Sequence, residues 1–163
     1  MTVAFYIAAV IAILTTLMVI TRSNAVHALL YLVVSLLAVA LAFYTLGAPF
    51  AAALEVIVYA GAIMVLFVFA VMVINLGPEQ TARERRWLRP GAWVGPSLLA
   101  LLLLVELVTL MTGGAAPAGT VDAKQLGITL YGPYLLAVEL ASLLLLAGLV
   151  AAYHVGRRAG GAR

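Results

Sequence analysis

Long apolar runs separated by short polar segments dominate this chain. Residues 23–54 and 56–78 contain no Asp, Glu, Lys or Arg, and Glu139 is the only such residue in 125–156. A helix crosses the ~30 Å hydrocarbon core of a bilayer with about 20 apolar residues. The pattern predicts an all-α membrane protein, with a single membrane domain over residues 1–163 and five transmembrane helices at about 3–20, 25–46, 50–76, 93–111 and 134–153.

The second and third spans are separated by no charged residue, so the boundary between them rests on backbone chemistry. Gly47-Ala48-Pro49 places a helix-ending glycine next to a helix-starting proline. One straight helix across both spans would far exceed the thickness of the bilayer. The sequence therefore predicts a tight hairpin at this tripeptide.

Basic residues fall almost entirely on one side of the predicted membrane. Lys124 is the only one on the other side. The eight that share a side are Arg22, Arg83, Arg85, Arg86, Arg89, Arg157, Arg158 and Arg163. Because lysine and arginine accumulate in cytoplasmic loops, the N-terminus is predicted to be periplasmic and the C-terminus cytoplasmic.

Composition narrows the possible chemistry. The chain is 66% hydrophobic and 9% charged, and it contains no cysteine. The absence of cysteine excludes disulfides and thiolate-ligated iron–sulfur clusters, and no ligand cluster is evident, so we expect no cofactor or metal to be bound by this chain. The net charge of +3 comes from arginines in connectors and in the tail. That distribution argues against nucleic-acid binding and for contact with the lipid bilayer.

Three carboxylates lie inside predicted spans: Glu55, Glu106 and Glu139. At about 1.5 Å per residue, each lies roughly 8 to 10 Å below the outer end of its helix. A charge at mid-bilayer costs at least about 2.5 kcal/mol, so these groups are expected to face protein or water, or to be protonated. For Glu55 and Glu139, proton exchange and plain interhelical hydrogen bonding both remain open. For Glu106 a structural or interfacial role is favoured.

The third span carries the most distinctive local pattern, EVIVYAGAI from Glu55 to Ile63. Glu55 and Tyr59 are four residues apart and share a helix face. Gly61 lies among alanines, where another helix can approach closely. The span is also longer than the bilayer requires, which is typical of a tilt or an irregular turn. Close packing at Gly61 and a hinge or π-bulge both remain open.

Most of the chain resembles one known family. The run EVIVYAGAIMVLFVFAVMVINL from Glu55 closely resembles the third helix of the J subunit of bacterial NADH:quinone oxidoreductase, or respiratory complex I, whose counterpart is the sixth mitochondrially encoded subunit. The resemblance continues through NAVHALLYLVVSLLAVA from Asn24, RRWLRP from Arg85 and GITLYGPYLLAVELASLLLLAGLVAAYHVGR from Gly127. The resemblance covers almost the whole chain, whereas Glu106 has no recognised counterpart in the family's pattern.

The resemblance implies a non-redox subunit in the membrane arm of a proton-pumping translocase of the bacterial inner membrane. Its expected partners are the A, K and H subunits. FMN, iron–sulfur clusters, NADH and quinone are expected to belong to the complex, and the isolated chain is expected to have no catalytic activity. In this family a π-bulge near the positions of Tyr59 and Gly61 is thought to open or close a water path to the pumping subunits. The resulting candidates for the proton path and its gate are Tyr59, Gly61, Glu55, Glu139 and Met64.

Two other classes of function are compatible with the composition. The first is a small transporter with Glu55 as its ion or substrate site, although no internal repeat of the kind common in transporters is present. Such a protein would survive purification alone and bind substrate, whereas a complex subunit would be unstable without partners. The second is a purely structural filler of the membrane arm, which only coupling measurements distinguish from a gate.

Overall fold

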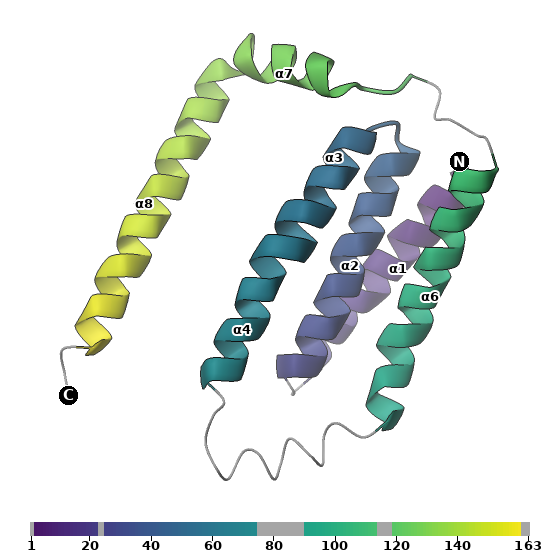
Figure 1. Cartoon of the computed structure of the whole chain (residues 1–163), viewed down its shortest axis with the longest axis horizontal. Helices are drawn as coiled ribbons and strands as arrows, with labels where there is room; N and C mark the ends of the chain where they lie inside the picture. The colour runs from purple at the N-terminus through teal and green to yellow at the C-terminus, as the bar shows by residue number, and fades with distance from the viewer. Residues whose placement is uncertain (1, 23–24, 75–89, 114–118, 161–163) are drawn as a thin grey trace. The chain divides into compact units, whose positions relative to one another are not determined.

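A computed structural model describes the chain except for residues 1, 23–24, 75–89, 114–118 and 161–163. The described part is helical and forms two compact units, residues 1–121 and 122–163 (Figure 1). Among the described residues, five helices are long and apolar enough to cross a membrane, which confirms the predicted number of spans. The loop predicted to carry Arg83, Arg85, Arg86 and Arg89 lies outside the described residues.

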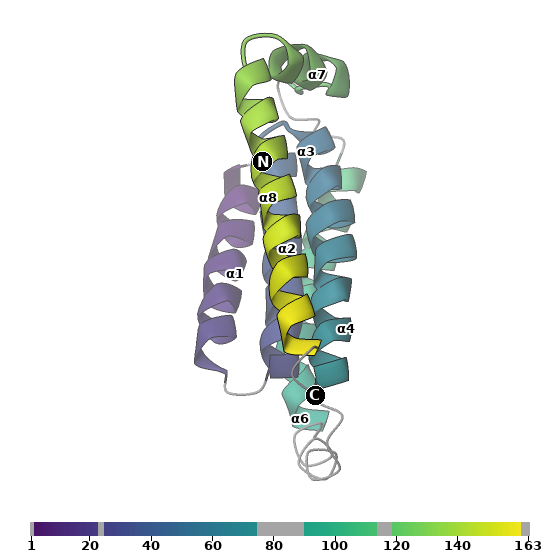
Figure 2. The ribbon, with the colours of Figure 1, turned by 90° about the vertical axis from the view of Figure 1, so that its left-hand side faces the viewer.

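The first unit is organised around α2, Ala25–Thr45, which packs against α1, Thr2–Thr21, and against the third span. Figure 2 shows α2 between α1 and α4. Its contact with α1 is lined by small side chains: Ala8 and Ala38 are fully buried. Small residues allow two backbones to approach closely, which is the main source of helix association in lipid. Hydroxyls add to this seam, because Thr16 and Ser35 are hydrogen-bonded at 2.9 Å.

The hairpin between the second and third spans forms as predicted. Gly47 has a φ of 85°, a left-handed conformation that glycine adopts without a steric penalty. Its amide donates to the carbonyl of Tyr44, and the amide of Ala48 donates to the carbonyl of Phe43, both at 3.0 Å. These two bonds are those of a Schellman motif, and Pro49 then begins the next helix.

The third span is one continuous helical path with three parts. α3 covers Pro49–Leu54, a π-helix labelled η1 covers Glu55–Ile63, and α4 covers Met64–Ile74. Met64 is almost fully buried, with 2% of its surface exposed. Most of the other side chains of η1 and α4 are exposed, so this span offers a broad apolar face for lipid or partner helices.

The fourth span, α6, runs from Pro90 to Thr112 and packs on α2 and, less extensively, on α1. Leu103 joins Ala8, Ile11, Val34, Ala38 and Leu41 in the apolar core of the unit. Beyond α6, the amide of Val121 donates to the carbonyl of Gly47 at 2.8 Å. This hydrogen bond links Val121, the last residue of the first unit, to the hairpin between α2 and α3.

The second unit contains α7, Ala123–Tyr131, and α8, Leu135–Gly160. The helix α7 was not predicted from the sequence. Asp122 begins it, because the Asp122 side chain accepts a hydrogen bond from the amide of Ala123 at 2.7 Å. The fifth span, Leu135–Arg157, lies within α8.

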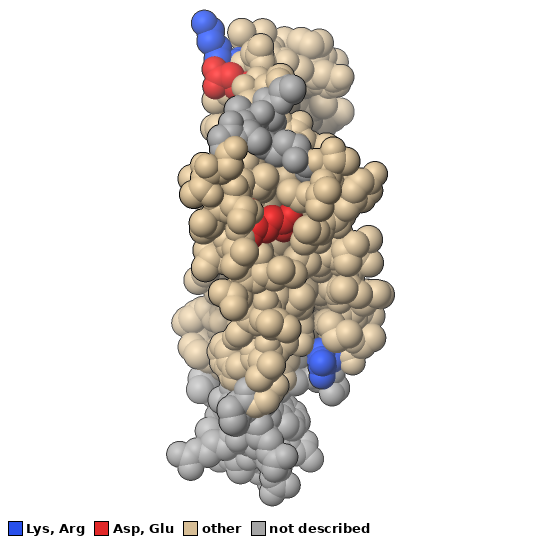
Figure 3. All heavy atoms as spheres, turned by 90° about the vertical axis from the view of Figure 1, so that its right-hand side faces the viewer, with Lys and Arg blue, Asp and Glu red and all other residues tan. Residues whose placement is uncertain are grey.

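Apolar side chains cover the described surface between the helix ends. The view toward α6 in Figure 3 is dominated by residues other than Asp, Glu, Lys and Arg, with one acidic patch at mid-height. A monomeric soluble protein rarely exposes contiguous apolar surface on this scale. Lipid and neighbouring membrane subunits are the surroundings that such a surface requires.

Candidate functional site

The π-helix in the third span is the feature that best fits a functional site. The amide of Met64 donates to the carbonyl of Tyr59, five residues back, and also to that of Gly61. A π-turn is rare because its hydrogen bonds replace the regular four-residue ladder, and it often marks a functional site. The structure thus favours the π-bulge over plain close packing, the two possibilities that the sequence had left open for this segment.

Gly61 is tied to the π-helix by its own backbone surroundings. A Cβ atom added at Gly61 would lie 3.1 Å from the carbonyl oxygen of Val56, and no other described helix comes within 4 Å of it. This oxygen is five residues back, which is the position that a π-turn brings beneath an amide. Glycine therefore relieves crowding inside the π-turn, and no described helix of the first unit packs against it.

The other predicted residues of this span lie on the same element or at its ends. Glu55 begins η1 and is partly buried, and Tyr59 is exposed. Met64 follows the last residue of η1, and its side chain is buried. Glu139 is an exposed residue of α8 in the second compact unit. Four of the five candidates therefore gather on one irregular segment.

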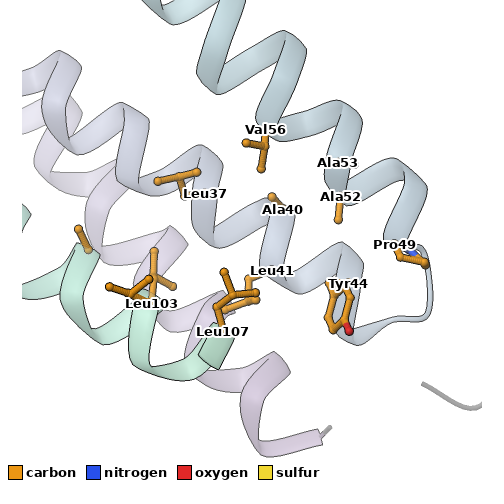
Figure 4. Close-up of a pocket in the computed structure, with 12 residues that line it drawn as sticks. Leu37, Ala40, Leu41, Tyr44, Pro49, Ala52, Ala53, Val56, Leu103 and Leu107 are labelled. Carbon is orange, nitrogen blue, oxygen red and sulfur yellow. The ribbon is translucent and has the colours of Figure 1, made fainter. Parts of the chain in front are cut away.

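An apolar cavity of about 360 Å³ adjoins the start of the π-helix (Figure 4). It lies between α2, the third span and α6. Val56 lines it, and so do Leu41 and Tyr44 of α2 and Leu103 and Leu107 of α6. This cavity has no signal in the sequence, because the three helices that line it are apolar around most of their circumference.

Glu106 lies apart from this cavity and is buried, with 7% of its surface exposed. Both carboxylate oxygens are enclosed and make no hydrogen bond within the described part of the chain. An ionised carboxylate in apolar surroundings without a partner is very unfavourable, so these surroundings suit the neutral acid. No interhelical hydrogen bond of Glu106 is present among the described residues, so the structural or interfacial role favoured from the sequence stays a prediction.

The described residues offer little to hold a cofactor. Among them there is no group of three or more His, Cys, Asp or Glu side chains that could hold a metal ion. What the arrangement provides is an irregular helix with a carboxyl at its start, a phenol within it and an apolar space beside it. A carboxyl and a phenol are both groups that can hold or release a proton.

Comparison with known proteins identifies related chains. Residues 15–155 match the family model of NADH-ubiquinone/plastoquinone oxidoreductase chain 6. The chain is 67% identical over 159 residues to NADH-quinone oxidoreductase subunit J of Pseudomonas aeruginosa, covering 95% of this chain and 96% of the relative. It is 60% identical over 157 residues to subunit J of Escherichia coli, covering 94% and 85%. Subunit J of Buchnera aphidicola from Schizaphis graminum is 47% identical over 156 residues, covering 94% and 96%.

Proposed function

We propose, from the premise that this chain belongs to the family of NADH-quinone oxidoreductase subunit J, that it helps couple quinone reduction to proton translocation through a water path gated at the π-helix of its third span. The chain is a multi-pass subunit of the bacterial inner-membrane complex. The observation that carries the proposal is the π-helix Glu55–Ile63, an irregular segment in the middle of an otherwise regular span.

The π-helix is suited to switching because its regular alternative is close in energy. Conversion to an α-helix moves the hydrogen bond of Met64 from the carbonyl of Tyr59 to that of Ala60, one residue further along. Each amide exchanges one acceptor for another, so the two forms are expected to differ by a few kcal/mol. The residues before the converted turn rotate about the helix axis, which turns Tyr59 and Glu55 toward new neighbours.

Such a rotation needs space, and the cavity beside Val56 supplies it. A close-packed interior does not deform continuously, so moving helices require either room or a second packing arrangement. The side chain of Val56 lines the cavity while its carbonyl oxygen lies against Gly61. Val56 therefore connects the π-turn at Gly61, which changes conformation, with the cavity that gives the helix room to move.

Gly61→Val tests the gate. The added Cβ would press on the Val56 carbonyl in the π-form, so the variant should favour the α-form and slow the exchange between the two. Proton pumping and quinone reductase turnover of the purified complex should fall several-fold. NADH oxidation by an artificial acceptor at the peripheral arm should remain near wild type, because that activity does not pass through the membrane arm.

The matched control is Gly148→Val on α8, where an added Cβ meets nothing within 4 Å. Both variants are compared at equal content of subunit J in the assembled complex. Wild-type pumping and turnover in Gly61→Val would reduce the π-helix to a local irregularity without a role in coupling. If pumping and turnover fell equally in both variants, the defect would come from placing a bulky valine in any membrane span, and not from the π-helix.

Glu139 is proposed as a protonatable group that supports charge transfer to neighbouring subunits. It is exposed on α8 within the second unit, so its carboxyl is open to a neighbouring helix or to water. Glu139→Gln keeps the shape and hydrogen bonding and removes ionisation, so it should lower the number of protons pumped per NADH in reconstituted vesicles. An unchanged ratio would make the residue structural.

The remaining assignments complete the proposal. The N-terminus is periplasmic and the C-terminus cytoplasmic, and the broad apolar faces of η1, α4 and α8 pack against the A, K and H subunits. The FMN, iron–sulfur clusters, NADH and quinone of the complex bind to other subunits, so the isolated chain has no activity of its own. A structure of the complex in which a side chain of this subunit ligates a cofactor would refute the last point.

A further inference from the structure

A second cavity lies at the opposite end of the helices from the α2–α3 hairpin. Its volume is about 240 Å³, room for several waters, and it is lined by Arg22, His27, Tyr31, Gly91, Val94 and Gly95. These residues come from the end of α1, the first turns of α2 and the first turns of α6. The end of α1, the start of α2 just after it, and the distant start of α6 therefore form one recess that holds an arginine, a histidine and a tyrosine at the end of the spans.

The guanidinium of Arg22 is held over this recess by an aromatic ring. Its central carbon lies 5.7 Å from the ring centroid of Tyr31, a cation–π contact. Tyr31 is 6% exposed and lines the recess, and its hydroxyl makes no hydrogen bond within the described part of the chain. The recess thus holds a positioned planar cation beside a buried hydroxyl that is available to donate.

The backbone adds to the positive potential of the recess. Two helices begin beside it, α2 at Ala25 and α6 at Pro90. Helix N-termini carry partial positive charge, which favours anions nearby. The described carboxylates of this unit, Glu55 and Glu106, lie toward the other end of their spans and so cannot neutralise the recess.

We infer that this recess binds the phosphate group of an anionic phospholipid. A guanidinium forms paired hydrogen bonds with phosphate oxygens, and the Tyr31 hydroxyl supplies another donor. The recess lies where α1 ends and α2 begins, at the height of the lipid headgroups beside membrane-spanning helices. Val94 on its wall is 63% exposed and offers an apolar surface to the acyl chains below the phosphate.

Photocrosslinking of the purified complex in detergent tests this assignment. The probe is a phosphatidylglycerol with a photoreactive group near its phosphate, and the readout is the labelling of subunit J peptides as the probe is titrated. Arg22→Gln removes a charge-assisted contact, so half-maximal labelling should need about ten-fold more probe. Arg157→Gln, which removes an exposed arginine of α8 outside the recess, should leave the titration unchanged.

The competing occupants give different results. Unchanged labelling in Arg22→Gln, or equal labelling by a matched phosphatidylcholine probe, would overturn the inference. Displacement of the probe by inorganic phosphate at equal concentration would show a free-anion site and overturn the lipid assignment. Loss of subunit J from the Arg22→Gln complex, whatever the lipid, would mean that Arg22 pairs with a carboxylate of a neighbouring subunit, which also overturns it.

Discussion

Glu106 shows how a single polar residue is accommodated inside an apolar helix. α6 buries it beside the core residue Leu103, and its oxygens find no partner in the described part of the chain. Leaving a buried polar group without a hydrogen bond costs about 1–3 kcal/mol. The residue is therefore expected to lower the stability of the subunit, unless a partner or a proton offsets the cost.

Glu106→Leu tests this balance. Leucine fills a similar volume without a polar group, so the variant should be as stable as wild type or more stable by about 1–3 kcal/mol. The measurement is the temperature at which subunit J dissociates from the purified complex. Glu106→Gln is the control, since it keeps a polar group in place. A less stable Leu variant beside an unaffected Gln variant would reveal a hydrogen-bond partner on another subunit.

At the scale of helices, the contact of α6 with α2 depends on one glycine. A Cβ added at Gly95 would overlap the hydroxyl of Tyr31, whereas a Cβ at Gly91 would meet nothing within 4 Å. Tyr31 is a buried residue of α2, so it has little freedom to move aside. The absence of a side chain at position 95 therefore sets how closely the two helices pack.

Gly95→Ala should destabilise the subunit by about 1–3 kcal/mol through overpacking. Gly91→Ala in the same helix should have little effect. Adding Tyr31→Phe to Gly95→Ala removes the overlapping hydroxyl and should restore part of the loss, measured as thermal release of subunit J. A double variant no better than the single one would show that the phenol is not what opposes the alanine.

The third span shows a different constraint at the same scale. Its conformation changes from α to π and back within one apolar stretch, and the helix keeps its direction through the change. Gly61 meets only the carbonyl of Val56, so the irregular turn is matched by a local sequence feature. If the π-helix Glu55–Ile63 switches conformation, the residues that permit the switch all lie within this one helix.

At the scale of the whole molecule, the orientation in the membrane is the prediction most open to direct test. The chain has no cysteine, so single cysteines can be introduced without a background from this subunit. From the distribution of arginine, cysteines at Thr2 and Thr120 should react with an impermeant thiol reagent added outside the inner membrane, and one at Ala159 should not. The reverse pattern would invert the topology and exchange the sides of both the hairpin and the recess at Arg22.

The sequence by itself determined the number of spans, the hairpin between the second and third spans, and the family. These features depend on the local sequence alone: runs of apolar residues long enough for a bilayer, a glycine and a proline at adjoining helix ends, and long stretches that resemble one family. The resemblance also pointed to a π-bulge near Tyr59 and Gly61, and the structure placed it at Glu55–Ile63.

Only the tertiary structure decided which faces of these helices are buried. Lipid is as apolar as leucine, so a helix that is apolar on all sides carries no pattern that reveals its inward face. Hence the burial of Glu106, the contact of Gly95 with Tyr31 and both cavities had no signal in the sequence. Each depends on how one helix is rotated and shifted against another, and that is fixed by close packing between residues far apart in the chain.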